Sequence, residues 1–273
     1  MLEQLSGATR LHIIVGDPIA QVKSPYGMTE AFDRAGLNAI CVPAHVSPTH
    51  LGTWWQGTRL AQNIDGLIVT VPHKFACADF CDTLSDRAAF LGAVNVARRL
   101  KDGRWEGDMF DGLGYVQALK KNGCDPHGRQ ALLIGAGGAG SAIAHSLVMA
   151  GVSSLTIVDP QTERCQPLVD RLNTLKRGPV RAGLADATGF DLVINATPMG
   201  MKEGDPLPVP LQGLDRLAHA GCVITAPAIS PWIAGARHIG CGTTTGADMF
   251  AQDRKSTRLN SSHIPLSRMP SSA

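Results

Sequence analysis

Two side chains in the first half of the chain could move a proton at a reacting oxygen. Lys74 follows Thr70-Val71-Pro72-His73 at the end of an apolar run, and Asp111 begins a predicted helix. A lysine near a carboxylate can hydrogen-bond a substrate oxygen and relay its proton. Each residue also has an ordinary interpretation, because most lysines are solvated and an aspartate before a helix is usually a cap. We expect the adjacent His73 to lie at the surface or to line a pocket rather than to take part in catalysis.

A glycine-rich turn in the second half of the chain predicts a dinucleotide site. Residues 135–140, Gly-Ala-Gly-Gly-Ala-Gly, follow the apolar run 131–134 and open into a helical pattern. Glycine allows the backbone to bend sharply and to approach a pyrophosphate, which the helix N-terminus then attracts. A second predicted strand, 155–158, ends in Asp159, whose carboxylate would meet a ribose hydroxyl. The alternative is a tight strand-to-helix turn that binds no ligand.

The elements around these residues alternate between strands and helices, which is typical of an α/β protein. Continuous apolar runs predict buried strands in the first half at 11–15, 39–43 and 66–71. Ser24-Pro25 is predicted to cap a helix that continues to about Ala35. Lys101-Asp102-Gly103 predicts a hairpin turn. In the second half, strands are predicted at about 131–134, 154–158, 191–195 and 222–225, and residues 195–201 leave the third of them at its carboxyl end.

We therefore expect two domains with mostly parallel sheets. An N-terminal substrate and catalytic domain spans 1–110 and is joined by a terminal helix at about 246–252. A Rossmann dinucleotide-binding domain spans 111–245. Residues 253–273 resemble a translated sequencing adapter, and their serine- and arginine-rich composition is typical of disorder, so we expect a non-native tail.

Composition excludes several classes of function. The formal net charge of +2 over 273 residues does not suggest a nucleic-acid or anionic-membrane partner. No apolar run approaches the length of a membrane span, and the N-terminus does not resemble a signal peptide, so a cytoplasmic location is expected. The seven cysteines are scattered and form no Cys-x-x-Cys pair, which argues against a metal site and a disulfide framework.

Several motifs, taken in order, make the chain similar to the shikimate dehydrogenase family over residues 10–252. They are Gly16-Asp17-Pro18-Ile19-Ala20 with Lys23-Ser24-Pro25, Val69-Thr70-Val71-Pro72-His73-Lys74, Gly92-Ala93-Val94-Asn95, Gly107 with Asp111-Gly112-Leu113-Gly114, the glycine turn, Asn195 to Met201, and Gly246 to Gln252. Each motif is modest alone, whereas their joint order is specific.

The resemblance implies an oxidoreductase that reversibly reduces 3-dehydroshikimate, or a close relative, with a nicotinamide cofactor. It implies that Lys74 and Asp111 form the catalytic pair and that the substrate lies between the domains. The implied substrate ligands are Ser24 for the carboxylate and Thr70, Asn95, Asp111 and Gln252 for ring hydroxyls. The implied cofactor ligands are Gly135, Gly137, Gly138, Ala139, Gly140, Asp159, Thr197, Met199 and Gly246.

The chain departs from the family pattern at positions that make the substrate site less polar. The departures are Gln21 and Val22 in the opening motif, Ile68 before the lysine segment, Met109-Phe110 before the aspartate, and Thr225 in place of a tyrosine. Sites that lose hydrogen-bonding groups select differently, so a paralogue acting on quinate, aminoshikimate or another ring carboxylate is favoured. The alternative is family drift with the substrate unchanged.

The residues after the second cofactor strand favour NAD over NADP. Members of the family that prefer NADP usually carry Asn-Arg-Thr there, whereas this chain has Asp159-Pro160-Gln161. Asp159 can accept a hydrogen bond from a 2′-hydroxyl and would repel a 2′-phosphate. Arg164 is expected to be solvated. NADP stays the alternative cofactor.

Two further interpretations remain open. One is a different enzyme on the same two-domain plan, such as a methylenetetrahydrofolate dehydrogenase. The other is a non-catalytic NAD-binding regulatory protein, which the loss of polar residues would suit and the retention of Lys74 and Asp111 would not. The chain is expected to act as a monomer or a homodimer on a small ring carboxylate.

Overall fold

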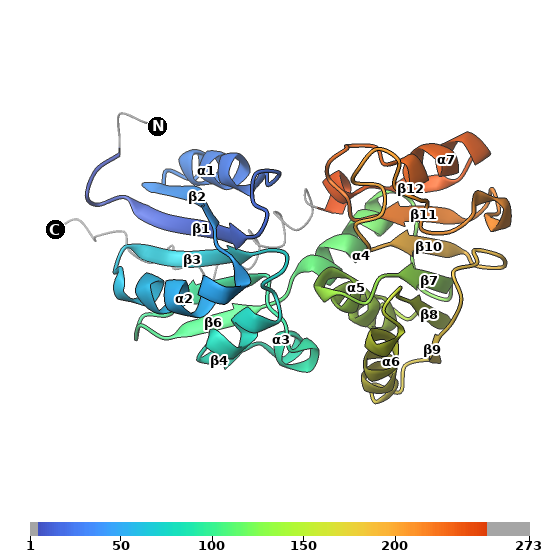
Figure 1. Cartoon of the computed structure of the whole chain (residues 1–273), viewed down its shortest axis with the longest axis horizontal. Coiled ribbons are helices and arrows are strands. Elements are labelled where there is room, and N and C mark those ends of the chain that lie inside the picture. The colour runs from blue at the N-terminus through green and yellow to red at the C-terminus, as the bar shows by residue number, and fades with distance from the viewer. Residues whose placement is uncertain (1–4, 250–273) are drawn as a thin grey trace. The chain divides into compact units, whose positions relative to one another are not determined.

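The computed structural model describes residues 5–249. The chain divides into two compact units, of which the first ends at Met109 and the second begins at Phe110 (Figure 1). Each unit is an α/β structure built on its own six-stranded sheet, which confirms the predicted fold class. The domain boundaries drawn from the sequence stay a prediction, and residues 250–252 of the expected terminal helix lie outside the described residues.

The first unit has a mixed sheet with the strand order β2-β1-β3-β5-β6-β4. Strands β2, β1 and β3 are parallel, β5 runs antiparallel to β3 and to β6, and β4 is parallel to β6. The elements are β1 (Arg10–Gly16), α1 (Ser24–Arg34), β2 (Ala39–His45), α2 (Leu51–Leu60), β3 (Ile64–Val69), β4 (Thr83–Leu84), α3 (Asp86–Leu91), β5 (Val96–Arg99) and β6 (Trp105–Asp108), with short 3₁₀ turns at Pro48–His50 and Ala76–Phe80.

Helix α1 covers one face of the parallel strands through an apolar cluster. Ile14, Phe32 and Cys41 are its buried centre. Five partly buried side chains pack against that centre: Ile19, Val22, Met28, Ala39 and Ile68. Ser24 is the first residue of α1 and Lys23 is its N-cap, so the predicted capping role of Ser24 is wrong. The helix instead begins with the proline in its first turn, where a missing N–H costs nothing.

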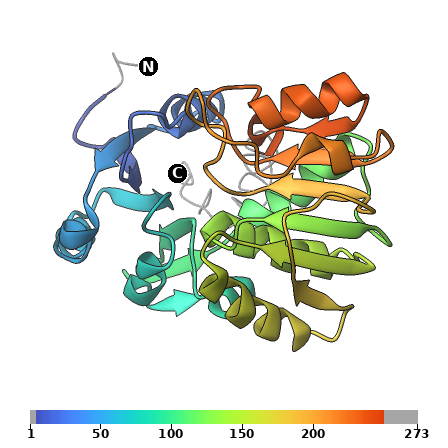
Figure 2. The ribbon, with the colours of Figure 1, turned by 45° about the vertical axis from the view of Figure 1, so that its right-hand side comes forward.

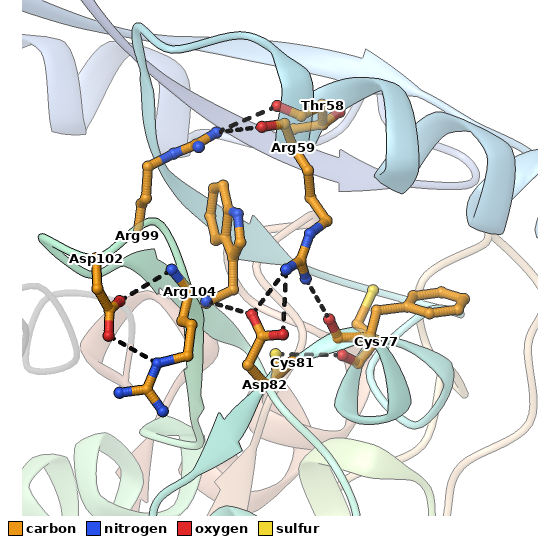
Figure 3. A network of polar contacts seen from close by, with 10 residues as sticks. Thr58, Arg59, Cys77, Cys81, Asp82, Arg99, Asp102 and Arg104 are labelled. Carbon is orange, nitrogen blue, oxygen red and sulfur yellow. Dashed lines mark hydrogen bonds and ion pairs between the residues drawn. The ribbon is translucent and has the colours of Figure 1, made fainter.

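An arginine network holds the other side of this unit together (Figure 3). The Arg99 guanidinium donates to the carbonyls of Thr58, Arg59 and Ala61, at the C-terminal end of α2, where a cation is favourable. It also lies 5.0 Å from the centre of the buried Trp105 ring. Arg59 in turn pairs with Asp82 at 2.9 Å. These contacts fix α2 against β5 and β6.

The second unit is a doubly wound parallel sheet with the strand order β12-β11-β10-β7-β8-β9. That order is the one shared by dinucleotide-binding α/β folds. In Figure 2 its strands lie side by side, coloured from green to orange. The elements are α4 (Asp111–Lys121), β7 (Gln130–Ile134), α5 (Gly138–Met149), β8 (Ser154–Val158), α6 (Cys165–Asn173), β9 (Val180–Ala182), β10 (Leu192–Asn195), β11 (His219–Cys222), α7 (Pro231–Ile239) and β12 (Gly242–Thr244), with 3₁₀ turns at Thr162–Arg164 and Leu211–Gly213.

The strand predicted at 222–225 lies at His219–Cys222, three residues earlier. The strand begins on a buried histidine, whose Nε2 is 2.8 Å from the hydroxyl oxygen of Thr244 on β12. Hydropathy alone does not show that such a polar residue belongs to a core strand. Strands β9 and β12 were not predicted, because each has only three residues.

Helices α4 and α5 approach closely at a glycine. A Cβ at Gly112 would collide with the carbonyl of Ala142 and the hydroxyl of Ser146. Because only glycine fits there, the N-terminal turn of α4 is held directly against α5. Asp111 lies in that turn.

Two buried histidines make the fold sensitive to acid. Burial lowers the pKa of His12 and of His219 from 6.5 to about 4. Below pH 6.5 the unfolded chain therefore takes up protons that the folded chain does not, so stability falls as the pH is lowered towards 4. We expect the free energy of unfolding to fall by roughly 1.4 kcal/mol per pH unit for each histidine in this window.

Urea unfolding at a series of pH values between 7 and about 4.5 measures this dependence. The His219→Gln variant keeps an amide that can bond Thr244 and should lose the share of the slope that His219 contributes. A free energy of unfolding that stays constant across this window in the unsubstituted chain would show that the two histidines are not held neutral.

Candidate functional site

Backbone hydrogen bonds in the first unit bring Thr70, Lys74 and Asn95 to one edge of the sheet. Thr70 directly follows β3, and its carbonyl accepts from the N–H of His73 at 2.9 Å. The Lys74 carbonyl accepts from the N–H of Val94 at 2.8 Å, and the Asn95 carbonyl accepts from the N–H at the end of β3 at 2.7 Å. Three of the predicted site residues are therefore neighbours at the carboxyl end of the parallel strands, where ligands bind in α/β sheets.

Ser24 begins α1 at this same end of the sheet, because the segment 17–23 leads directly from the carboxyl end of β1 into the helix. Ser24 is buried and Thr70 is half-buried. Neither hydroxyl is hydrogen-bonded to another residue within 5–249. Thr70 also fills the space beside Gly16, where a Cβ would lie 2.5 Å from its methyl group. A glycine at the end of β1 thus leaves room for the Thr70 side chain.

His73 is buried rather than exposed, so the predicted surface or pocket-lining role is wrong. Its side chain is 1% accessible to solvent. Its ring Nε2 lies 2.7 Å from the carbonyl oxygen of Val46, which follows β2. The ring points away from the solvent and into the unit, where the Val46 carbonyl accepts its hydrogen bond.

The two predicted catalytic residues belong to different units. Lys74 lies half-buried in the first unit, and Asp111 is the first residue of α4 in the second unit, 6% accessible. Their pairing stays a prediction. Gln252, the remaining expected substrate ligand, lies outside the described residues.

The glycine turn of the second unit has the shape that the sequence predicts. Gly135 has a φ of +108°, which disfavours any residue with a side chain. A Cβ at Gly135 would also lie 2.8 Å from the carbonyl carbon of Ala196, and a Cβ at Gly140 would collide with the carbonyl of Gly135. These two glycines let the turn close between β7 and the start of α5.

Gly137 has a different role, because a Cβ there would meet no atom within 4 Å. Gly137 is the N-cap of α5, a helix of 12 residues. Open space beside backbone N–H groups at a helix N-terminus is what a bound pyrophosphate requires. The turn therefore fits the phosphates of a dinucleotide cofactor.

Asp159 follows β8 and its carboxylate is bound to the turn. Oδ2 accepts from the N–H of Ala136 at 2.6 Å, and Oδ1 accepts from the N–H of Gln161 at 2.8 Å. The side chain is 8% accessible to solvent. Asp159 thus lies where the sequence places it, next to the glycine turn, and it also holds that turn in shape.

The segment after β10 is held by a buried asparagine, which the sequence indicated only as the first residue of the motif 195–201. The side-chain oxygen of Asn195 accepts from the N–H and the hydroxyl of Thr197, at 3.0 and 2.6 Å, and its amide donates to the carbonyl of Met199 at 2.9 Å. The adjacent Gly135 would contact the Thr197 methyl group if it carried a Cβ. Thr197 and Met199 therefore lie at the switch point between β7 and β10, beside the glycine turn.

The remaining predicted cofactor ligand lies one strand further along the sheet. Gly246 packs so closely on the carbonyls of Val223 and Ile224 that a Cβ would collide with both.

The Asn-x-Thr spacing at 195–197 is the signal that could have identified Asn195, because asparagine often bonds the backbone two residues on.

Within residues 5–249, no group of three or more histidine, cysteine or acidic side chains could hold a metal ion. All seven cysteines are free thiols. No helix in that range is long and apolar enough to cross a membrane.

Comparisons with known proteins agree with this geometry. The family model described as the shikimate dehydrogenase substrate binding domain matches residues 14–97, which run from β1 into β5. A curated relative from Rubrobacter xylanophilus, named shikimate dehydrogenase (NADP(+)), is 39% identical over 212 residues, covering 76% of this chain and 74% of the relative.

Two solved structures are similar over nearly the whole chain. Shikimate 5-dehydrogenase from Listeria monocytogenes, in complex with shikimate and NAD, has a TM-score of 0.84 and 28% identity, covering 93% of this chain and 92% of that one. Quinate dehydrogenase from Corynebacterium glutamicum, in complex with NAD, has a TM-score of 0.82 and 27% identity, covering 92% and 93%. The 39% identity to the relative from Rubrobacter xylanophilus, over 76% of this chain and 74% of the relative, shows that the chain belongs to the shikimate dehydrogenase family of NAD(P)-dependent oxidoreductases.

Proposed function

We propose that this chain reversibly oxidises a ring hydroxyl of shikimate, or of a close ring carboxylate such as quinate or aminoshikimate, with a nicotinamide dinucleotide. The observation that carries the proposal is the convergence of Thr70, Lys74 and Asn95 at one edge of the first sheet. A hydroxyl, an amine and an amide there offer hydrogen bonds to a polyhydroxylated ring. The membership of the family and the glycine turn of the second unit support the same activity.

The proposed chemistry divides between the cofactor and the protein. A bound nicotinamide would supply the hydride acceptor for the carbon that carries the reacting hydroxyl. The proton of that hydroxyl passes to the Lys74 amine or to water, with Asp111 as the second member of the catalytic pair. Ser24 binds the ring carboxylate. Thr70 and Asn95 bind ring hydroxyls, with Gln252 as a further ligand.

The apolar side chains of Val22 and Ile68 support a substrate other than shikimate as the preferred one. Val22 and Ile68, which replace polar residues of the family pattern, pack in the same cluster under α1. Ile68 is the penultimate residue of β3, and Thr70 directly follows the strand. An apolar group in place of a hydrogen-bonding partner weakens binding of the substrate hydroxyl or carboxylate that it faced.

The choice between NAD and NADP rests on opposing observations. The relative from Rubrobacter xylanophilus is named for NADP(+), which favours NADP. Asp159 favours NAD, because its carboxylate lies against the glycine turn and a 2′-phosphate would meet its negative charge. We keep the preference for NAD as a proposal and the preference for NADP as the outcome that contradicts it.

Replacing Lys74 by alanine tests the catalytic role. Loss of the amine should lower kcat by about 10²- to 10⁴-fold, because proton transfer loses its positioned group, while the dissociation constant of the cofactor stays unchanged. Absorbance at 340 nm follows turnover, and fluorescence titration follows cofactor binding. Lys101→Ala, at the exposed hairpin turn, is the matched control and should keep the full rate. Full activity of Lys74→Ala would remove the residue from the chemistry.

A single added hydroxyl tests the substrate assignment. Val22→Thr keeps the volume of the side chain and adds a donor at one of the positions where this chain is less polar than the family pattern. We expect its kcat/KM for both shikimate and quinate to rise by about tenfold, the effect of one hydrogen bond to the carboxylate that the two acids share. Val42→Thr on β2 controls for the added hydroxyl itself. If the kcat/KM values of Val22→Thr equal those of the unsubstituted chain, the side chain at position 22 does not face the ring carboxylate.

The charge at position 159 tests the cofactor assignment. Asp159→Asn removes the negative charge and keeps one of the two oxygens that accept from the N–H groups of Ala136 and Gln161. The ratio of kcat/KM for NAD to that for NADP should fall by about tenfold or more, since like charges no longer meet. Asp170→Asn on the exposed face of α6 serves as the control. A tenfold preference of the unsubstituted chain for NADP would overturn the proposed NAD preference.

A further inference from the structure

His73 lies immediately before the proposed catalytic lysine, and it is buried in the first unit. Its ring is 1% accessible, and Nε2 lies 2.7 Å from the Val46 carbonyl oxygen. A carbonyl only accepts hydrogen bonds, so Nε2 carries the hydrogen and donates it. The bond ties the turn after β3 to the residue after β2.

The turn that carries Lys74 is therefore held from two sides. The sheet order β2-β1-β3-β5 places β2 on one side of β3 and β5 on the other. The His73 ring reaches across β1 to the end of β2, whereas the Lys74 carbonyl accepts from Val94, which leads into β5. The N–H of Cys77 also bonds to the His73 carbonyl at 2.9 Å. These bonds leave the backbone of residues 73 and 74 little freedom.

We propose that His73 is a positioning residue for Lys74, which it serves by anchoring the turn to Val46. The inference rests on the proposed function, because it requires that the Lys74 amine acts on the substrate. A catalytic group must be held within a fraction of an ångström of its working position, and a flexible lysine depends on a fixed backbone for this. The ring supplies that constraint without touching the substrate.

Variants at position 73 separate the hydrogen bond from the bulk of the ring. His73→Phe keeps an aromatic ring and removes the donor. His73→Gln places an amide N–H near the position of Nε2 and keeps the donor. We expect kcat of His73→Phe to fall by about 10- to 100-fold, with KM for the ring acid and the dissociation constant of the cofactor within about threefold. His73→Gln should recover most of that loss.

A loss of stability alone would not give this pattern. Thr58→Val removes another buried hydrogen bond of the first unit, from the Thr58 hydroxyl to the Trp54 carbonyl, at 2.9 Å. It should lower the midpoint of thermal unfolding and leave kcat unchanged. Tryptophan fluorescence reports whether each variant is folded, with Trp55 and Trp105 buried in the first unit and Trp232 buried in the second. If His73→Phe does not fold, the comparison of His73→Gln with Thr58→Val still decides the result.

The outcomes are distinct. Unchanged kcat in folded His73→Phe overturns the inference, as does a folded His73→Gln whose kcat falls as far as that of His73→Phe. When His73→Gln alone folds, a kcat close to that of the unsubstituted chain supports the inference and a kcat lowered more than tenfold overturns it. Full activity of Lys74→Ala, measured beside them, would instead refute the proposed function.

Discussion

Close approach of backbone to backbone at the ends of parallel strands is the constraint on which the candidate dinucleotide site of the second unit depends. A side chain at Gly135 or Gly140 would drive the glycine turn away from β10 or from itself. With both positions free of Cβ atoms, the N-terminus of α5 lies beside Asp159 and Thr197. The space at Gly137 is then left open for phosphate. The cofactor site thus depends on the absence of side chains at these glycines as much as on its polar groups.

The ring half of the proposed site is built differently, by anchoring one turn to the strands on both sides. Thr70 and Lys74 come from one motif and Asn95 from another, and they meet because backbone hydrogen bonds join the end of β3 to the start of β5. A buried histidine anchors that turn to Val46, and an apolar cluster packs α1 against the parallel strands. Hydrogen bonds thereby position these three residues, while Val22 and Ile68 pack in the apolar cluster under α1.

Local patterns predicted the parts of this structure that depend on neighbouring residues. The glycine turn, Asp159 and the Asp-Gly hairpin were readable because backbone conformation limits the residue types that fit. The direction of the His73 ring was not readable, since its acceptor Val46 lies 27 residues earlier in the chain. The start of β11 at His219 was not predicted for the same reason, because the hydrogen-bond partner of this histidine, Thr244, comes 25 residues later. Strands of three residues carry too little periodicity to be recognised.

The central claim is that one chain binds a ring carboxylate on its first unit and a nicotinamide dinucleotide on its second. A crystal structure with both ligands tests it most directly. The account predicts the pyrophosphate against Gly137 and the N-terminus of α5, and the ring hydroxyls within hydrogen-bond distance of Lys74, Thr70 and Asn95. A ring bound away from Lys74, or a dinucleotide bound away from the glycine turn, would contradict it.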